Sequence, residues 1–386
     1  MHNLSTPPRL STPEPTFSHH RPAIRHRGVV TTTTKILADG RTGVSVREPA
    51  QLIASLPPLL GFRPADSLVV LGLGGPDGGQ VCPAVRLDLP AAEHEPDIVQ
   101  ALMEIFADSA VRAVNIVVVG RHPSQPPPTT PPHRRLVELL CAAFAVLGPK
   151  VQHATWASEI RAGAPWHCYL EKDCEGVLPD ENSTVTAAVF AASGHVTFDS
   201  REELADQLAP DDEAAVRRRA ELMNAAVDAL DPSVTAERRR DHGLALVRSA
   251  LGRVRRGDLS FSDKEVVDLA LALSNTAVRD ACLALATVPY ASRQAERLWL
   301  ELVRRTPAPE RTEPAVLLTY SAYLRGEGAL AGIAADNALE ANPANVLAGL
   351  LSRCLRTAFP PDRLTALAET DHLGALCPPD TPRATS

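Results

Sequence analysis

Short apolar runs alternate with amphipathic segments in the first half of the chain. The runs are rich in β-branched and aliphatic residues, which is typical of strands that are covered on both faces. The predicted strands are Ser67–Leu73, Val81–Leu89, Val114–Val119 and Val151–Trp156. The second strand follows the first across a glycine-rich turn and alternates charged with apolar residues, which predicts a hairpin. Two segments with apolar residues at helical spacing, about 96–109 and 136–147, lie between the later strands.

This order of strands and helices predicts an α/β domain over residues 43–200, with a mixed, partly parallel sheet and flanking helices. Near its start we expect a strand at Val44–Val46 and a helix that begins at Pro49 and ends at Pro57-Pro58. The last part of the domain is less regular. There we expect an edge strand and two further strands, at Trp166–Leu170, Thr184–Phe190 and His195–Phe198.

Residues 201–376 have a helical pattern almost throughout and predict a second, α-helical domain. Ser200 and Glu203 form a capping pattern at its start. Apolar residues then recur at helical spacing, for example between Val346 and Leu355. Residues 313–343 contain two short helices around a glycine-containing turn and resemble a tetratricopeptide unit, in which small residues let helices pack closely. We therefore expect one or two tetratricopeptide-like pairs in this domain.

Both ends of the chain have the composition of disordered tails. Residues 1–42 are rich in Pro, Ser, Thr and His and poor in large apolar side chains, and residues 377–386 are proline-rich. Such segments bury too little apolar surface to offset the conformational entropy lost on folding. We therefore expect four parts: a tail, an α/β domain, a helical domain and a second tail.

Charge and composition exclude several classes of partner and location. The chain has 386 residues, a net charge of −7 and a pI of about 6.0, so we expect no nucleic acid partner, which would require a basic surface. No stretch approaches the roughly 18 uninterrupted apolar residues of a membrane span, and the N-terminus lacks the apolar run of a signal peptide. The seven cysteines are scattered and do not form a disulfide framework. A cytoplasmic protein without membrane contact is expected.

Three arginine runs, at 217–219, 238–240 and 253–256, lie on predicted helices with acidic residues nearby. Solvated helix faces with ion pairs explain such mixed patterns, and we favour that interpretation. The alternative is a surface for an acidic partner or nucleic acid.

Two other motifs have a functional and a structural interpretation. Gly72-Leu73-Gly74-Gly75 follows a strand as a dinucleotide-binding loop does, but Asp77 replaces the last glycine of that motif and a strand follows, so a hairpin turn is favoured. Trp166-His167-Cys168 with Cys174 offers thiol and imidazole groups, but too few ligands for structural zinc. We predict no metal, no cofactor and no catalytic residue.

A small-molecule site is conceivable where the loop at 120–133 follows an apolar strand. Ligands of parallel sheets bind at the carboxyl ends of strands. The candidate ligand-binding residues are Asp66, Asp88, Arg121 and His122, with Arg121 as the group for an anion. The alternative interpretation of this loop is a proline-rich insertion that binds nothing.

One tract carries a family resemblance. Residues 56–70, LPPLLGFRPADSLVV, resemble the signature of the domain-of-unknown-function family 4192, which is found mainly in actinobacteria. Supporting tracts extend the resemblance over about 44–360, including Trp166 and Tyr169 of a Trp-x-x-Tyr element. The family pattern continues with a Cys-Cys-Pro element, of which this chain keeps Cys174 and has Glu175 at the second position. The resemblance implies no established activity.

Two functions remain open at this point. The sequence favours a non-enzymatic protein that binds a protein partner through its helical domain, because stacked helix pairs form extended binding surfaces. The alternative is a metabolite-binding or enzymatic α/β domain with a pocket at the carboxyl edge of the sheet. The sequence leaves the question of enzymatic activity open.

Overall fold

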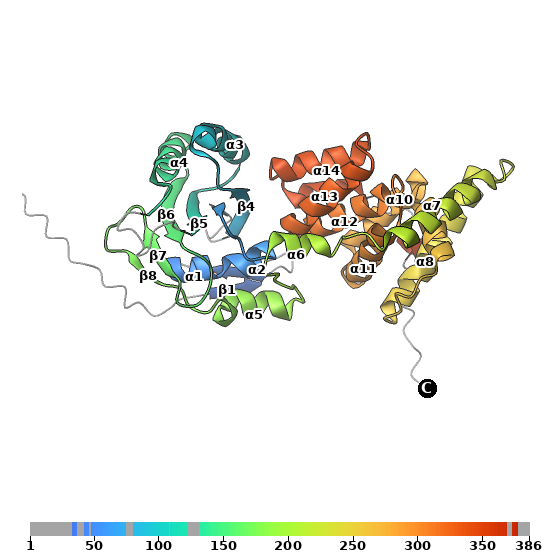
Figure 1. Cartoon of the computed structure of the whole chain (residues 1–386), viewed down its shortest axis with the longest axis horizontal. Helices are drawn as coiled ribbons and strands as arrows, with labels where there is room; N and C mark the ends of the chain where they lie inside the picture. The colour runs from blue at the N-terminus through green and yellow to red at the C-terminus, as the bar shows by residue number, and fades with distance from the viewer. Residues whose placement is uncertain are drawn as a thin grey trace, which may run out of the picture. The chain divides into compact units, whose positions relative to one another are not determined.

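The structure is a computed structural model. It describes residues 33–36, 42–45, 48–74, 80–107, 109–121, 131–368 and 373–376. Among them, residues up to about 200 form a sheet with flanking helices, and those beyond are mostly helical (Figure 1). This confirms the predicted fold class.

The main sheet has six strands in the order β4-β3-β5-β6-β7-β8. Neighbouring strands are antiparallel except for the β5–β6 pair, which is parallel, so the predicted mixed sheet and the β3–β4 hairpin are both confirmed. The strands are β3 (Ser67–Gly74), β4 (Gln80–Asp88), β5 (Ala113–Val119), β6 (Lys150–Ala157), β7 (Pro165–Cys168) and β8 (Glu175–Val177).

Alternate side chains of the central strands enter two different hydrophobic cores. Leu68 and Val70 of β3 pack with α3 (Glu95–Ala107) and α4 (Arg134–Leu147), which Figure 1 shows together on one face of the sheet. Val69 and Leu71 enter a second core with α1 (Pro49–Ala54) and the first residue of α2 (Leu56–Leu60) on the other face. This two-residue period explains why β3 and β5 are buried along their whole length.

Several local predictions are wrong. Thr184–Phe190 is not a strand: Thr184 caps α5 (Val185–Ala192) by accepting a hydrogen bond from the Ala187 amide, which favours a helix despite the β-branched residues. His195–Phe198 forms only an isolated bridge from Phe198 to Phe62. Pro57 and Pro58 do not end helical structure, because they lie in the first turn of α2, where proline is tolerated.

Two strands also differ from their predicted places. β7 is not an edge strand, since β8 pairs with its outer side. β1 (Thr33–Ile36) lies in the predicted N-terminal tail and pairs with β2 (Thr42–Ser45), which overlaps the strand predicted at Val44–Val46, in a two-stranded antiparallel sheet.

The C-terminal region surrounds one buried helix, α12, in which every residue from Pro314 to Tyr323 is buried. Figure 1 shows α12, α13 and α14 stacked in sequence. The two helices and the glycine turn expected at 313–343 are present as α12 and α13, with Gly326 in the left-handed conformation between them. Their assignment to a tetratricopeptide unit stays a prediction. The helices are α6 (Arg201–Asp206), α7 (Glu213–Asp228), α8 (Ala236–Arg255), α9 (Asp263–Leu273), α10 (Thr276–Leu283), α11 (Pro289–Arg305), α12 (Thr312–Arg325), α13 (Gly328–Ala341), α14 (Val346–Arg356) and α15 (Leu373–Leu376).

Four short 3₁₀ segments complete the described elements. They are η1 (Ala92–His94), η2 (Glu181–Ser183), η3 (Ala284–Thr287) and η4 (Pro361–Leu367). In the described part of the chain, no single helix is both long and apolar enough to cross a membrane. One pair of consecutive segments, 263–273 with 276–287, meets that test only jointly and is bent by 90°.

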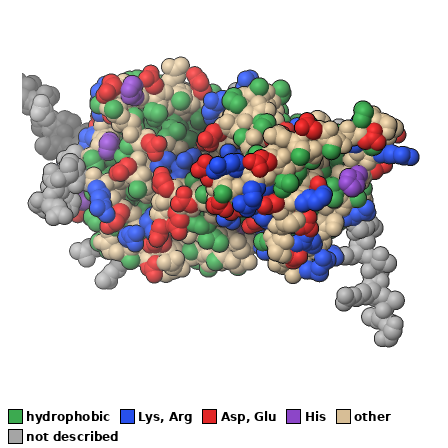
Figure 2. Space-filling view, turned by 45° about the vertical axis from the view of Figure 1, so that its right-hand side comes forward, with side chains coloured by type: hydrophobic (Ala, Val, Ile, Leu, Met, Phe, Trp, Pro, Cys, Tyr) green, Lys and Arg blue, Asp and Glu red, His purple; other side chains and the backbone are tan. Residues whose placement is uncertain are grey.

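Buried arginine holds three segments of the helical region together. Arg219 of α7 is 3% exposed, and its guanidinium donates to Asp263 at 2.6 Å, to Asp211 at 2.8 Å and to the carbonyl of Arg305 at 3.0 Å. The Arg305 carbonyl belongs to the last turn of α11, where helix carbonyls lack intrahelical partners. One side chain from a predicted arginine run therefore has an internal, structural role. Figure 2 shows basic and acidic side chains intermixed on the visible face.

Candidate functional sites

The predicted ligand-binding residues of the α/β domain gather at one edge of the sheet. Ser67, the first residue of β3, is paired with Asp88 at the end of β4 and with Val119 at the end of β5. Asp66, Asp88 and Arg121 therefore lie at the same edge, where β4, β5 and β6 have their carboxyl ends. His122 lies outside the described residues.

Opposite charges pair with each other along this edge. Arg86 contacts Asp88 at 2.7 Å and donates to the Ser67 hydroxyl at 2.9 Å. Arg121 is 85% exposed on its side chain and lies 3.8 Å from Glu159.

Backbone geometry holds Asp66 in place. It has a left-handed φ of 44°, and its carbonyl accepts a hydrogen bond from the Leu89 amide at 3.0 Å. A Cβ atom at Gly120 would come within 3.3 Å of the Asp66 carboxylate, so glycine lets this side chain approach the end of β5.

A second charged group at this end of the domain was not predicted from the sequence. Arg63 donates to Glu181 at 2.6 Å and also to Asp199, and this guanidinium holds the pKa of the Asp199 carboxyl below its usual value. Arg63 is more than a hundred positions from each carboxylate in the sequence, so no local pattern signals their contact. The guanidinium engages both carboxylates and compensates one of their two negative charges.

A hollow of about 160 Å³ lies elsewhere in this domain, beside α4 and the turn after β7. It contains none of the predicted site residues. Its lining is formed by Arg134, Val137, Glu138, Cys141, Tyr169 and Leu170. Among the residues that the structure describes, no group of three or more His, Cys, Asp or Glu side chains has the arrangement of a metal site.

The helical region presents a different surface on α14, which we call the α14 face and define by Val346, Leu350, Arg353 and Arg356. Val346 is 86% exposed and Leu350 is 42% exposed, although the sequence placed both in an apolar helical pattern. The opposite side of α14 packs against α12 and α13 through Ala348, Leu351 and Cys354. The apolar residues of α14 therefore extend around more of the helix circumference than α12 and α13 cover.

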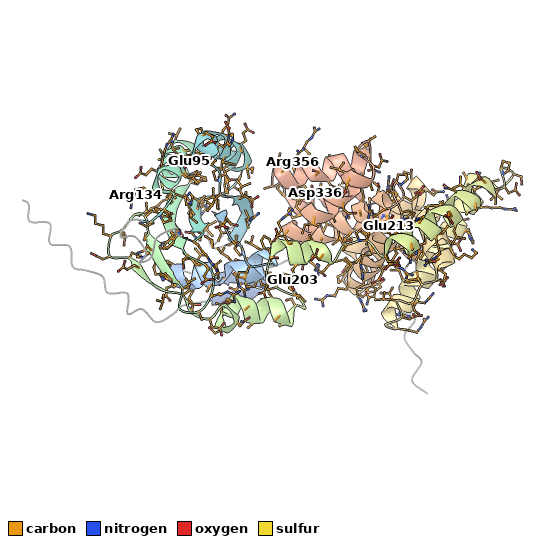
Figure 3. All side chains as sticks on the ribbon, in the orientation of Figure 1. Glu95, Arg134, Glu203, Glu213, Asp336 and Arg356 are labelled. Atoms are coloured by element: carbon orange, nitrogen blue, oxygen red, sulfur yellow. The ribbon has the colours of Figure 1, made fainter. Side chains whose placement is uncertain are left out.

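Two exposed arginines continue the α14 face toward the end of the helix. Arg353 and Arg356 form no ion pair within the described part of the chain, and Figure 3 shows Arg356 extending away from the helices below it. A Cβ atom added to Gly349, on the flank of this face, would meet no other atom within 4 Å. The α14 face thus combines open apolar surface with two cations.

The start of α14 is fixed by a hydrogen-bonded cap. The Asn345 side chain accepts from the Ala348 amide at 2.9 Å and donates to Glu313 of α12 at 3.1 Å. Glu313 in turn accepts from Arg279 of α10 at 3.2 Å. The cap connects the exposed helix to two buried ones.

A buried ionisable cluster lies between α11 and the α12–α13 turn. Arg325 donates to both Glu296 and Glu327, and His195 lies 3.3 Å from Glu327. Burial raises the pKa of Glu296 to about 7, and burial also lowers the pKa of His195. Glu296 therefore titrates near neutral pH, and both groups contribute to the pH dependence of stability.

Comparison with known proteins identifies one family. A family model described as "Domain of unknown function (DUF4192)" matches residues 49–362. No curated protein and no solved structure shows a significant match.

Proposed function

We propose that this chain, which belongs to the family of domain of unknown function 4192, binds an acidic amphipathic helix of a partner protein on the α14 face. The observation that carries this proposal is the order of side chains on that face. Two exposed apolar residues, Val346 and Leu350, are followed by Arg353 and Arg356, two exposed cations with no ion pair to any residue that the structure describes.

The apolar part of the α14 face supports a protein partner. A single exposed apolar residue is ordinary on a protein surface, but Val346 and Leu350 are one helical turn apart and form a continuous strip. A partner helix would remove this strip from water and pack against Gly349, where space is open. Apolar anchors spaced by one turn are the usual contacts of a helix that binds in this way.

The charged part of the α14 face supports an acidic partner. The whole chain has a net charge of −7, yet this end of α14 carries Arg353 and Arg356, and Arg363 of η4 is also exposed. Complementary carboxylates would steer the partner and fix its register along the helix. The 11 residues of α14 span roughly 16 Å, which suits a partner helix of about three turns.

The proposal is tested by affinity purification of the tagged full chain from its native cells, followed by mass spectrometry. The test variant is L350D/R353E on α14. The matched control is L222D/R217E on α7, because Leu222 is 44% exposed, close to the 42% of Leu350, and both arginines are exposed. We expect a protein that the wild type and the control retain and that the α14 variant loses.

The interaction is then measured with the purified partner by titration calorimetry. We expect the α14 variant to bind about tenfold more weakly or worse, and wild-type binding to weaken as salt is raised. Retention of the same proteins by all three forms, or equal loss in the control, would exclude the α14 face.

A second candidate function is supported by one observation, the convergence of Asp66, Asp88 and Arg121 at the carboxyl edge of the sheet. Sheet edges of this kind hold small ligands in many α/β proteins. The same purification distinguishes it when small molecules are also identified. A metabolite that the α14 variant retains and an Arg121→Ala variant loses would favour a ligand site at the sheet.

A further inference from the structure

Two of the free cysteines face each other across the β7–β8 hairpin. The register of this hairpin pairs His167 with Glu175, so Cys168 and Cys174 are the next opposed residues. The Cys168 amide donates to the Cys174 carbonyl at 2.8 Å. Directly opposed residues of antiparallel strands have Cα atoms about 4.5–5.5 Å apart, which lies within the usual range for a disulfide.

Neighbouring contacts fix this register. The Nδ1 atom of His167 lies 2.9 Å from a carboxylate oxygen of Glu175 on one face of the hairpin. On the other face, a Cβ atom at Gly176 would lie 3.1 Å from the indole nitrogen of Trp166, so the glycine lets the indole pack against β8. A shift by one residue would break both contacts. The two sulfurs are therefore held opposite each other by the hairpin itself.

We propose that Cys168 and Cys174 are a redox modification site that closes to an intramolecular disulfide in the presence of a hydroperoxide. One thiolate attacks the O–O bond of the peroxide, becomes a sulfenic acid and releases hydroxide, which takes up the thiol proton and leaves as water. The second thiolate then attacks the oxidised sulfur, forms the S–S bond and expels a second hydroxide, which leaves as water with the second proton. Two electrons pass from the thiols to the peroxide.

Exposure and protonation set the threshold of this site. Cys174 is partly exposed, which gives the oxidant access, whereas Cys168 is 8% exposed and receives a hydrogen bond from the Leu170 amide at 3.4 Å. Burial and the neighbouring Cys168 raise the pKa of Cys174 to about 11. Because the thiolate is the nucleophile, we expect slower oxidation than for an ordinary exposed cysteine and a requirement for sustained peroxide.

Cys141 provides the internal control. This cysteine belongs to α4 and packs into the core on one face of the sheet, whereas Cys174 packs with Trp166 into the core on the opposite face. Cys141 is partly exposed, as Cys174 is, but it has no cysteine opposite it in a strand pair. Oxidation at Cys141 should therefore not produce this disulfide.

The test uses the full chain treated with hydrogen peroxide, blocked with N-ethylmaleimide and digested with trypsin without reduction. Cleavage after Lys172 separates the two cysteines, so a disulfide appears as a linked pair of peptides. We expect the Cys168–Cys174 pair in the wild type and in Cys141→Ser, its absence in Cys174→Ser, and its loss on treatment with dithiothreitol. Circular dichroism under reducing conditions checks that each variant is folded.

Three results would overturn the proposal. They are a linked pair that contains Cys141, oxidation that stops at unlinked sulfenic or sulfinic acids, and linked peptides that come only from intermolecular dimers on a non-reducing gel.

Discussion

The sheet and the helical region differ in how their buried polar side chains are paired. In the sheet, the side-chain amide oxygen of Asn115 and the Thr155 hydroxyl are buried without a hydrogen-bond partner among the described residues. In the helical region, Arg219 is equally buried but forms three hydrogen bonds to three separate segments. The interior of the sheet is therefore held by apolar burial and backbone hydrogen bonds. The helical region also contains buried groups without a partner among the described residues, at Thr306 and Trp299, but it has in addition an ion-pair network around one buried arginine.

The strongest test of this difference is Arg219→Met. The substitution leaves Asp211, Asp263 and the Arg305 carbonyl without their common donor, and we expect a loss of about 3 kcal/mol in the free energy of unfolding. Urea denaturation measures it. Arg217→Met is the matched control, because Arg217 is 65% exposed and pairs only with Glu213 of its own helix, so we expect a change below about 0.5 kcal/mol.

The pH dependence of the stability lost in Arg219→Met distinguishes lost ion pairs from lost packing. Arg219 lowers the pKa values of Asp211 and Asp263 in the folded protein, so their contribution to stability is present above pH 4 and is lost as the pH falls through the folded pKa values. The difference between wild type and variant should therefore shrink in acid. A cost that is independent of pH would indicate lost packing rather than lost ion pairs.

Glu296→Gln tests the case in which a buried ionisable group of the helical region opposes stability. Its folded pKa of about 7 is above the ordinary glutamate value of 4.5, so its favourable contribution is complete below pH 4.5 and is lost as the pH rises through 7. The variant should gain up to about 3 kcal/mol relative to wild type between pH 4 and pH 8. Glu340→Gln, at an exposed position of α13, should show no such trend.

His195 contributes to the pH dependence of stability in the opposite direction. Both the wild type and Glu296→Gln contain His195, so this contribution cancels when the two proteins are compared at each pH. Burial lowers the pKa of that imidazole, so its contribution is lost as the pH falls below about 6.5. A pH-independent difference between Glu296→Gln and wild type would show that Arg325 neutralises the carboxylate fully.

The smallest expected effect is the difference in stability cost between two tryptophan substitutions, one in each region. Trp156 of β6 donates its indole N–H to the Gly120 carbonyl at 3.0 Å, whereas the Trp299 indole nitrogen in α11 has no partner among the described residues. Trp156→Phe should therefore cost about 1–2 kcal/mol more than Trp299→Phe, since it leaves a buried carbonyl unpaired. Thermal and urea unfolding of the two variants compare them. Equal costs would mean that packing alone sets both.

Sequence periodicity predicted the strands better than the irregular segments. Strands β3 and β5 were identifiable because a strand covered on both faces is apolar throughout. Residues 184–190 contain β-branched residues, which favour a strand, but the cap formed by Thr184 favours a helix and decides the outcome. The convergence of Asp66 and Asp88 was predictable from strand order, since one register places both at the same edge.

Ion pairs across long sequence separations were not predictable. The contacts of Arg63 with Glu181 and of Arg219 with Asp263 join residues on different elements, and nothing in the sequence near either partner indicates the other. The exposed face of α14 was missed for a related reason. Apolar spacing identifies the helix, but tertiary packing decides how much of its apolar arc is covered.

The Asn345 cap has a consequence for how the α14 face meets any other molecule. Because Asn345 is hydrogen-bonded to Glu313 of α12, which in turn accepts from Arg279 of α10, the first turn of α14 cannot swing outward without breaking its contact with α12. The backbone of this turn is already fixed in the free protein, so docking there would cost it little conformational entropy. The entropy lost on association would come mainly from the partner. A rigid platform of this kind favours selectivity for shape over adaptation to many ligands.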